Sequence, residues 1–545
     1  MKDQNIYRQI DRLVSYGIAC KLLPEEEQVY ATNLILDLLH LDYYDGLFFR
    51  ELKWEESVRR NPEDTCRLSK ILEPLVLYGL KNKLVPDMLP LRDVFDAKLM
   101  NCIMPRPKAV VDWFWGEYAK SPETATLKYF TFSKDSNYIR RDRIARDIKW
   151  EGATKYGNLE ILISLSKPEL EPAAIAAASR ARATGYPKCA LCRENEGYAG
   201  RVDFAARQNH RIIPLKLCGK DFSLQFSPYR YCHQHCIVLS HNHVPMVVDE
   251  RAVEKILEFV TLFPHYFLGS NSDLPYVGGS VLSHEHFQGG VHRLPIMDAK
   301  VKKDYIKTKD FELCTLNWPL STIRIKGSNK RDIINVATHI IRSWRGVRQS
   351  DYNTTCIDYL GYRDDDALID PGTLEERHNA ITPLAYREGS DYVLFIMLRN
   401  NKCTKERPDG LFHTHPDRFH IKKEGIGIID APGLAILPPR LKKELSLVAQ
   451  VLTGKVKLNQ NSKMIKELEI EKENESEIEK TIEKHKTWMN EILSKYEKLD
   501  DNNIGKILQN EIVLVFMKML EDCAVFKTDQ EFEKFMRVAC SAFLP

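Results

Sequence analysis

The chain has 545 residues, of which 43% are hydrophobic and 28% charged, as in ordinary globular proteins. Because a single core stops growing near about 250–300 residues, this length predicts at least two domains. Lys plus Arg is 79 and Asp plus Glu is 76, so the net charge of +3 argues against general electrostatic binding to nucleic acid or an anionic membrane. The composition also excludes collagen-like, disordered and small disulfide-rich proteins.

No export or membrane signal is read from the sequence. The first residues lack a basic stretch followed by an apolar core, and no run of about 18 uncharged apolar residues occurs. Most of the thirteen cysteines stand singly, which favours reduced thiols in the cytosol. We therefore expect a cytoplasmic protein that binds neither nucleic acid nor membrane.

Four regions follow one another along the chain. Residues 1–149 read as mainly helical, because apolar residues such as Ile6, Ile10 and Leu13 recur at helical spacing. Between residues 150 and 440, short β-rich runs at 159–165, 236–239 and 393–398 alternate with turn signals and with a helical pattern at 251–262. Regular βαβ spacing is lacking, so an α+β fold with mainly antiparallel sheet is expected.

Helix returns in residues 441–545. Residues 463–498 are dense in Glu and Lys and have few turn formers after Asn474. This pattern is typical of a solvated helical pair with charge pairs four residues apart.

Chemistry concentrates between His210 and His292, where nine of the sixteen histidines fall. Residues 278–290 read GGSVLSHEHFQGG. On an extended strand, His284, His286 and Gln288 share one face. Glycine pairs on both sides allow a ligand to approach the backbone closely. Two imidazoles and an amide in this setting indicate a binding site for an anionic phosphoryl group. The alternative, a polar strand face whose histidines belong to the core, is less favoured.

This segment resembles the active-site strand of the histidine-triad superfamily, in the nucleotidyltransferase branch, where glutamine replaces the third histidine. Residues 271–290 as a whole resemble the class II galactose-1-phosphate uridylyltransferases of bacteria. Supporting stretches lie at 138–140, 186–192, 420–424 and 435–438. The resemblance implies two diverged histidine-triad-like halves, at 150–305 and 306–440, flanked by helical regions at 1–149 and 441–545.

The resemblance also implies a ping-pong reaction. His286 would attack the α-phosphorus of UDP-glucose, glucose 1-phosphate would leave, and galactose 1-phosphate would then take up the uridylyl group. The carbonyl of His284 would hold the other ring nitrogen of His286, and Gln288 would donate to a phosphoryl oxygen. Both leaving groups are phosphates and leave without protonation by a strong acid. A glutamine is therefore sufficient at the third position.

Further substrate contacts are expected from residues at or near motif positions. Asn209, in the stretch 207–211, matches the region where relatives contact uridine and ribose. Asn271 and Ser280 are expected near the α-phosphate, and Gly289 beside the substrate. No organic cofactor is implied, and a homodimer is expected.

Cys189 and Cys192 have the spacing of half a zinc site. Related class I enzymes bind zinc with such a pair, a histidine after a strand and the first histidine of the motif. The matching set here is Cys189, Cys192, His243 and His284, with His241 as the alternative to His243. A structural zinc is therefore expected, while two packed thiols without metal remain the alternative.

Two other histidine groups resemble metal sites in their composition. Residues 231–236 read YCHQHC, but Cys232 and Cys236 would face away from His233 and His235 on a regular strand, so core thiols are favoured. His413 and His415, with His420 nearby, resemble half of the second metal site of the class I relatives, for which no matching glutamate is found.

Two other functions remain open from the sequence. One is a nucleotide hydrolase or adenylyltransferase with the same fold. The other is a catalytically inactive, zinc-stabilised protein that binds nucleotides.

Overall fold

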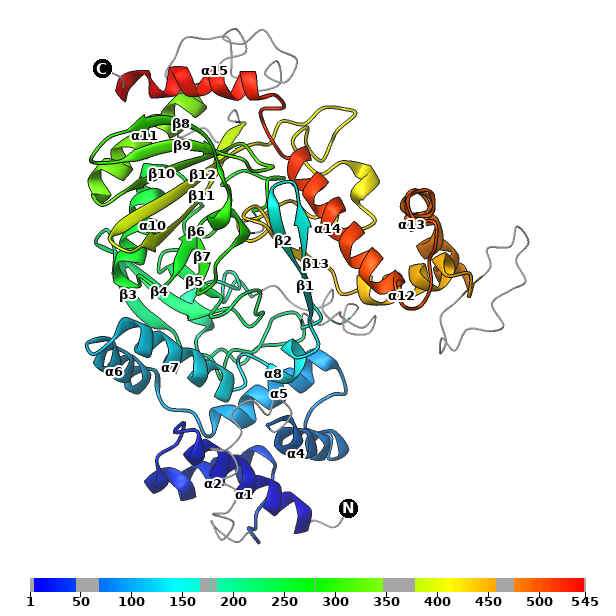
Figure 1. Cartoon of the computed structure of the whole chain (residues 1–545). Helices are drawn as coiled ribbons and strands as arrows, with labels where there is room; N and C mark the ends of the chain where they lie inside the picture. The colour runs from blue at the N-terminus through cyan, green and yellow to red at the C-terminus, as the bar shows by residue number, and fades with distance from the viewer. Residues whose placement is uncertain are drawn as a thin grey trace.

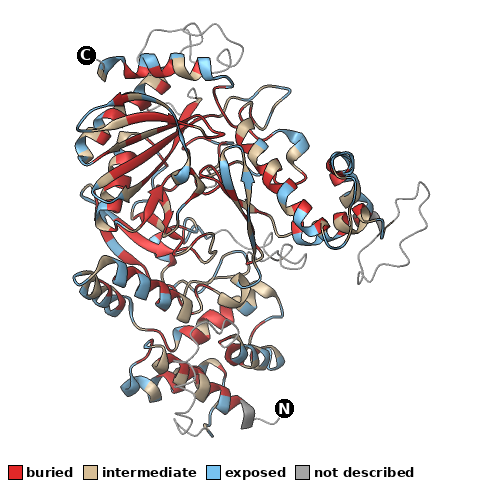
Figure 2. Ribbon diagram, in the orientation of Figure 1, coloured by how far each residue is buried: buried red, intermediate tan, exposed pale blue. Residues whose placement is uncertain are grey.

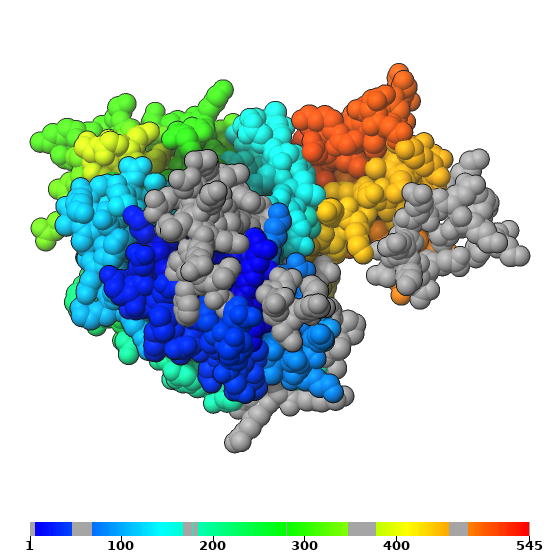
Figure 3. All heavy atoms as spheres, turned by 90° about the horizontal axis from the view of Figure 1, so that it is seen from below, coloured from blue at the N-terminus to red at the C-terminus, as the bar shows by residue number. Residues whose placement is uncertain are grey.

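The computed structural model describes residues 4–45, 68–166, 184–279, 281–346, 378–456 and 475–543, together with residue 177. The described chain begins with a helical region, which lies below the main sheet in Figure 1 and occupies much of the face seen from below in Figure 3. Its helices are α1 (Gln4–Ala19), η1 (Glu25–Glu27), α2 (Gln28–Leu38), α4 (Ser69–Lys81), α5 (Leu89–Asn101), α6 (Pro107–Tyr118), α7 (Pro122–Asp135) and α8 (Arg141–Ile144).

A ten-stranded antiparallel sheet forms the centre of the protein. Its order is β3-β4-β5-β7-β6-β11-β12-β10-β9-β8. The strands are β3 (Ile213–Leu217), β4 (Lys220–Phe226), β5 (Cys236–Ser240), β6 (Phe267–Gly269), β7 (His286–Gly290), β8 (Val301–Lys307), β9 (Glu312–Leu316), β10 (Thr322–Gly327), β11 (Asn379–Glu388) and β12 (Asp391–Asn400). The predicted strands at 236–239 and 393–398 correspond to β5 and β12.

The strand order repeats, which confirms two diverged halves. From each outer edge inward, both halves place their strands in the same sequence, first, second, third, fifth and fourth. In each half a helix connects the third and fourth strands, α10 (Glu250–Leu262) in the first and α11 (Lys330–Arg345) in the second. The halves join at β6 and β11, where Gly269 pairs with Leu384 and Leu268 with Ala385.

Side chains of the sheet alternate between two cores, as the period of a strand requires. On β12, Leu394 and Ile396 belong to the core that α10 and α11 cover, whereas Val393, Phe395 and Met397 belong to a second core on the opposite face. Figure 2 shows the resulting continuous burial of the central strands. The antiparallel, α+β architecture is therefore as predicted.

A smaller sheet and the C-terminal helices form a further layer beside the main sheet. The small sheet has the order β1-β2-β13, and β13 runs parallel to β2. The main helix of this layer, α14, contacts β1 and β2, while α15 lies beside β8 and α11. The elements are β1 (Ile148–Thr154), β2 (Gly157–Ile163), β13 (Leu434–Leu437), α12 (Leu441–Leu452), α13 (Glu475–Lys495), α14 (Ile504–Asp522) and α15 (Asp529–Cys540), with short helices η2 (Arg193–Asn195), η3 (Pro295–Asp298), η6 (Pro416–Arg418) and η7 (Ser541–Phe543).

The charged C-terminal segment differs from the predicted solvated helical pair. Its first part, residues 463–474, lies outside the described residues, and the described part contributes a single helix, α13. Trp488, Met489 and Ile492 are buried in the second core, so one face of α13 packs against the protein. The buried apolar face of α13 was not predicted, because Glu and Lys dominate the sequence of this segment. Within the described ranges, no helix is long and apolar enough to cross a membrane.

Candidate active site and metal cluster

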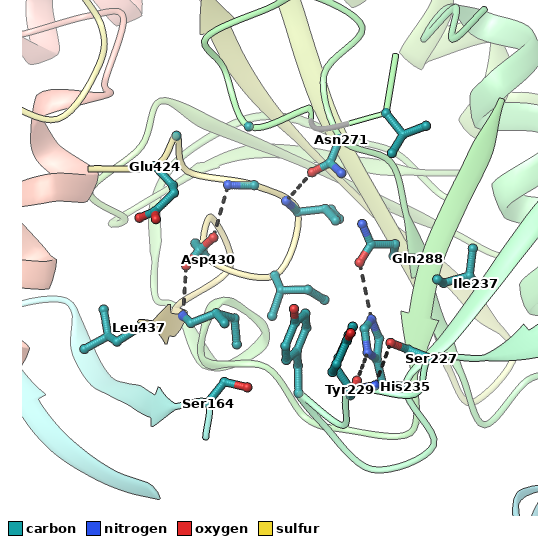
Figure 4. Close-up of a pocket in the computed structure, with 18 of the residues that line it drawn as sticks. Ser164, Ser227, Tyr229, His235, Ile237, Asn271, Gln288, Glu424, Asp430 and Leu437 are labelled. Carbon is teal, nitrogen blue, oxygen red and sulfur yellow. Dashed lines mark hydrogen bonds between the residues drawn. The ribbon is translucent and has the colours of Figure 1, made fainter. Parts of the chain in front are cut away.

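A cavity of about 580 Å³ lies where the first half of the sheet meets β13 and the loop before it. This volume is typical of a small-molecule site. His286 and Gln288 line it from β7, and Lys422 and Asp430 line it from the loop. Figure 4 shows Gln288 and Asp430 on opposite sides of the space, with Asn271 above them.

His286 is held in one tautomer. Its Nδ1 lies 2.8 Å from the carbonyl oxygen of His284, so the Nδ1–H donates and Nε2 keeps its lone pair. The ring is buried, 5% exposed, and this burial lowers its pKa from the ordinary value, against the opposing effect of the His284 carbonyl. A neutral imidazole with a free Nε2 on the cavity wall is suited to nucleophilic attack.

The motif does not form one regular strand as expected. The strand β7 begins at His286, and His284 lies in a bend before it. Consequently His286 and Gln288 line the cavity together, whereas the His284 ring contacts Cys189 instead. The expectation that all three side chains share a face was therefore wrong for His284, because the chain turns before the sheet pairing starts.

Four side chains converge around that bend. The ligand atoms of Cys189, Cys192, His243 and His284 all lie within 4.8 Å of one another. Cys189 Sγ lies 3.2 Å from Nδ1 of His284, and Cys192 Sγ lies 3.2 Å from Nδ1 of His243. Two thiols and two imidazoles are the donor set of a tetrahedral zinc site, so the residues fit a metal ion.

Neighbouring groups hold these donors in place. The Nε2–H of His284 donates to the carbonyl of Ser240 at 2.8 Å, which leaves Nδ1 facing the cysteines. The side-chain amide of Asn195 donates to the carbonyls of Cys189 and Cys192 at 2.9 and 2.7 Å. Outer contacts of this kind orient metal ligands.

His241, the alternative to His243, is directed elsewhere. Its Nε2 lies 2.7 Å from the hydroxyl oxygen of Ser223, and its Nδ1 faces Arg193 at 3.4 Å. The geometry therefore brings His243, and not His241, to the cysteine pair.

The expected substrate contacts are dispersed. Asn271 lines the cavity, and its Oδ1 accepts from the backbone N–H of Ile428 at 2.8 Å. Ser280 lies outside the described residues. Asn209 lines a separate cavity of about 370 Å³ between the N-terminal helices and the sheet, and it donates to the carbonyl of Ser136 at 2.8 Å. Tyr229 lines both cavities.

Gly289 lies away from the cavity wall, at a close approach of two strands. A Cβ atom at this position would come within 2.3 Å of the backbone oxygen of Phe267 on β6. Packing therefore requires a glycine at this position, because no side chain fits between β6 and β7 there.

Several residues of the cavity wall were not predicted from the sequence. Lys422 and Asp430 form a buried ion pair with Nζ 2.5 Å from Oδ1. Asp430 also accepts from the backbone N–H groups of Gly427 and Ile436, at 3.2 and 3.0 Å. Lys422 lies in the stretch 420–424, which was noted only for its resemblance to the family. Asp430, the partner of Lys422, lies in no recognisable sequence motif. His235 also lines this wall.

The other histidine groups do not converge on one point. The ring of His415 contacts Asp417, while His420 Nδ1 donates to the Asp417 carbonyl at 2.8 Å. Burial lowers the pKa of His420 to about 4, and the neighbouring ring of His485 adds to this effect. The segment 231–236 forms a turn before β5, and its two cysteines are buried in different cores, as the thiol interpretation predicts.

Among the described residues of the second half, β12 carries no histidine at the place of the nucleophile. The strand β12 occupies the place of β7 in the repeat, and the face that would carry reactive groups presents Val393, Phe395 and Met397. These side chains belong to the core that the C-terminal helices share.

Comparisons with known proteins agree with this arrangement. Residues 63–245 match the family description "Galactose-1-phosphate uridyl transferase, N-terminal domain", and residues 258–467 match its C-terminal domain. A galactose-1-phosphate uridylyltransferase of Clostridium acetobutylicum is 40% identical, covering 98% of this chain and 100% of the relative. One from Caldanaerobacter subterraneus subsp. tengcongensis is 38% identical, covering 97% of each chain. The chain therefore belongs to the galactose-1-phosphate uridylyltransferase family.

Proposed function

We propose that the protein transfers the uridylyl group of UDP-glucose to galactose 1-phosphate through a covalent intermediate on His286. The observation that carries the proposal is the His286 ring, whose Nδ1–H is held by the His284 carbonyl at 2.8 Å while Nε2 remains free at the cavity wall. Membership of the family supports the overall reaction.

The first step forms a bond between Nε2 of His286 and the α-phosphorus. The bond from this phosphorus to the oxygen of glucose 1-phosphate breaks, and that oxygen keeps the electron pair. The Nδ1–H stays on the ring and its hydrogen bond to His284 stabilises the positive charge that develops. An oxygen of galactose 1-phosphate then attacks the same phosphorus, UDP-galactose leaves, and His286 is regenerated.

Gln288 supports both steps from the same face of β7. Its side-chain amide lines the cavity two residues beyond His286 and is proposed to donate to a non-bridging phosphoryl oxygen. It carries no group basic enough to activate water, which favours transfer to a sugar phosphate over hydrolysis.

Isotope exchange tests this function directly. The protein is incubated with UDP-glucose and labelled glucose 1-phosphate, with no second sugar present, and label is expected to enter UDP-glucose. His286→Ala is expected to abolish the exchange, whereas His233→Gln, a change in a nearby turn, is expected to retain it. Release of UMP into water without an acceptor favours the hydrolase, and nucleotide binding without exchange favours the inactive protein; either result overturns the proposal.

We further propose that Cys189, Cys192, His243 and His284 hold a zinc ion. The donor set supports this identity, since two thiolates and two imidazoles suit tetrahedral zinc. When bound, the ion would supply structural rigidity to the bend that carries the His284 carbonyl. Metal analysis of the purified protein checks this proposal, and a different bound metal overturns it.

The remaining expectations stand as proposals. Asn209, Asn271 and Ser280 are proposed to lie near the bound nucleotide, whereas Gly289 is assigned a packing role between β6 and β7. The regions 1–149, 150–305, 306–440 and 441–545 are proposed as the domain division. A cytoplasmic location and a homodimer are likewise proposed, together with the absence of an organic cofactor. Sedimentation equilibrium tests the dimer, and an absorbance spectrum of the purified protein tests for an organic chromophore.

A further inference from the structure

His235 is a buried histidine beside Gln288 that the steps above do not use. Its side chain is 3% exposed, and its ring stacks on that of Tyr231 at 4.9 Å. Nδ1 lies 2.9 Å from the carbonyl oxygen of Tyr229, and Nε2 lies 3.3 Å from Oε1 of Gln288. Figure 4 shows the ring between these two partners, with the amide nitrogen of Gln288 directed away from it.

The partners of His235 determine where its protons are. A carbonyl oxygen only accepts, so the contact with Tyr229 requires a proton on Nδ1. In a neutral ring, Nε2 is then an acceptor and cannot bond to Oε1 of Gln288, which is also an acceptor. The observed arrangement is therefore a hydrogen bond only when Nε2 is protonated as well and the ring is an imidazolium.

The neutral ring requires the opposite orientation of the glutamine. Gln288 must then turn its amide by about half a rotation and donate its NH₂ to Nε2 of His235. In that orientation its carbonyl oxygen is directed toward the cavity, where it repels a phosphoryl group. With His235 protonated, the NH₂ is directed toward the cavity and donates to a phosphoryl oxygen.

In the absence of an anion the surroundings of His235 favour the neutral ring, so the orientation of Gln288 seen here corresponds to the protonated form that a bound anion would stabilise. Burial lowers the pKa of His235 from its ordinary value. Its ring contacts, among the described residues, are the Tyr229 carbonyl, the Tyr231 ring and the Gln288 amide, and none of these carries a charge. The Tyr231 phenol stays neutral because burial raises its pKa to about 12. A bound phosphoryl group would supply the negative charge that stabilises the imidazolium.

We propose that His235 is a positioning residue that takes up one proton as the nucleotide binds and thereby turns the NH₂ of Gln288 toward the transferred phosphoryl group. The inference rests on the proposed uridylyl transfer and deepens it. The proton comes from the solvent and returns to it when the nucleotide leaves, so the reaction consumes none.

Calorimetry of UDP-glucose binding measures this proton directly. The His286→Ala variant lacks the nucleophile, so binding is measured without reaction, and titrations at one pH near 7 are repeated in buffers of different ionisation enthalpy. We expect an uptake approaching one proton per nucleotide, because the buried ring is neutral at this pH before binding and is protonated in the complex. No uptake overturns the proposal.

A second variant assigns the proton to His235. In His286→Ala with His235→Gln, the new amide donates to Gln288 without titrating, so uptake is expected to fall to near zero. His286→Ala with His233→Gln serves as the matched control and is expected to keep the full uptake. Equal uptake in all three proteins overturns the assignment, and so does loss of uptake in the control.

Kinetics of the otherwise unaltered protein separate this inference from the proposed function. As the pH rises above 7, kcat/KM for UDP-glucose is expected to decline by up to about tenfold per unit, and His235→Gln is expected to flatten the decline. His235→Ala is expected to lower kcat. Identical pH profiles of the native protein and His235→Gln overturn the inference while leaving the exchange reaction intact, whereas failure of the function appears as no exchange in the native protein.

Discussion

Replacing one member of the buried Lys422–Asp430 pair is expected to destabilise the protein strongly, whereas replacing both costs much less. The two charged atoms are 2.5 Å apart, and the residues are 5% and 6% exposed. At this distance and an effective dielectric constant of about 20, their attraction is about 7 kcal/mol. Desolvation of the two ions offsets most of it, so the intact pair adds little net stability.

Removing one partner leaves the other as an uncompensated buried charge, which typically costs about 3–5 kcal/mol. Lys422→Met is expected at the lower end, about 3 kcal/mol, because Asp430 keeps two backbone N–H donors at 3.0 and 3.2 Å. Asp430→Asn is expected to cost about 4 kcal/mol, since a neutral amide then faces the Lys422 ammonium. With both replacements, about 1–2 kcal/mol is expected, because neither member of the pair is left facing an unpaired partner.

Urea unfolding followed by circular dichroism measures the free energy of unfolding of the four proteins. Lys108→Met is the matched control, because the Lys108–Asp112 pair is also close, 2.7 Å, but its side chains are 85% and 60% exposed. That control is expected to change stability by less than about 1 kcal/mol. The reasoning is refuted if each single replacement at the buried pair costs under about 1 kcal/mol and the double replacement equals their sum.

Three further predictions concern pH, metal and packing. Because burial lowers the pKa of His420 to about 4, unfolding takes up a proton there between pH 6.5 and 4. Stability should fall by about 2 kcal/mol from pH 7 to 5 for this reason, and His420→Gln should remove that part of the fall, as urea midpoints at both pH values measure. Cys192→Ser should lower bound zinc from about one per chain to near zero by mass spectrometry, with a lower melting temperature. Gly289→Ala should cost about 1–3 kcal/mol in urea unfolding, because its Cβ meets the Phe267 carbonyl oxygen at 2.3 Å.

Each of these has a contrary outcome. An unchanged pH dependence in His420→Gln would mean that another group takes up the proton. Full zinc content in Cys192→Ser would remove this cysteine from the ligand set. A neutral effect of Gly289→Ala would show that β6 moves aside freely.

Periodicity and local motifs predicted much of the architecture. Short β-rich apolar runs identified β5 and β12, and the helical spacing at 251–262 corresponds to α10 (Glu250–Leu262). Cysteine spacing indicated Cys189 and Cys192, a signal that is local in sequence. The two histidines that converge with them, His243 and His284, were implied by the resemblance to class I relatives.

Features that depend on distant partners were not predictable in the same way. Lys422 and Asp430 form the cavity wall only because the loop before β13 folds against the first half of the sheet. His235 acquires a partner in Gln288 only because β5 pairs with β7, where Ile237 opposes Gln288. The bend at His284 arises from pairing that starts at His286, which alternation along one strand does not reveal.

The junction between the two halves has a consequence for how the chain folds. The strands β6 and β11 meet through only two residue pairs. Each strand nevertheless covers the inner edge of the other half of the sheet. A fragment that ended after β7 would leave β6 with open backbone donors and acceptors, which invites aggregation with a second copy. We therefore expect the halves to be poor candidates for separate expression, although each carries a complete set of five strands and its own connecting helix.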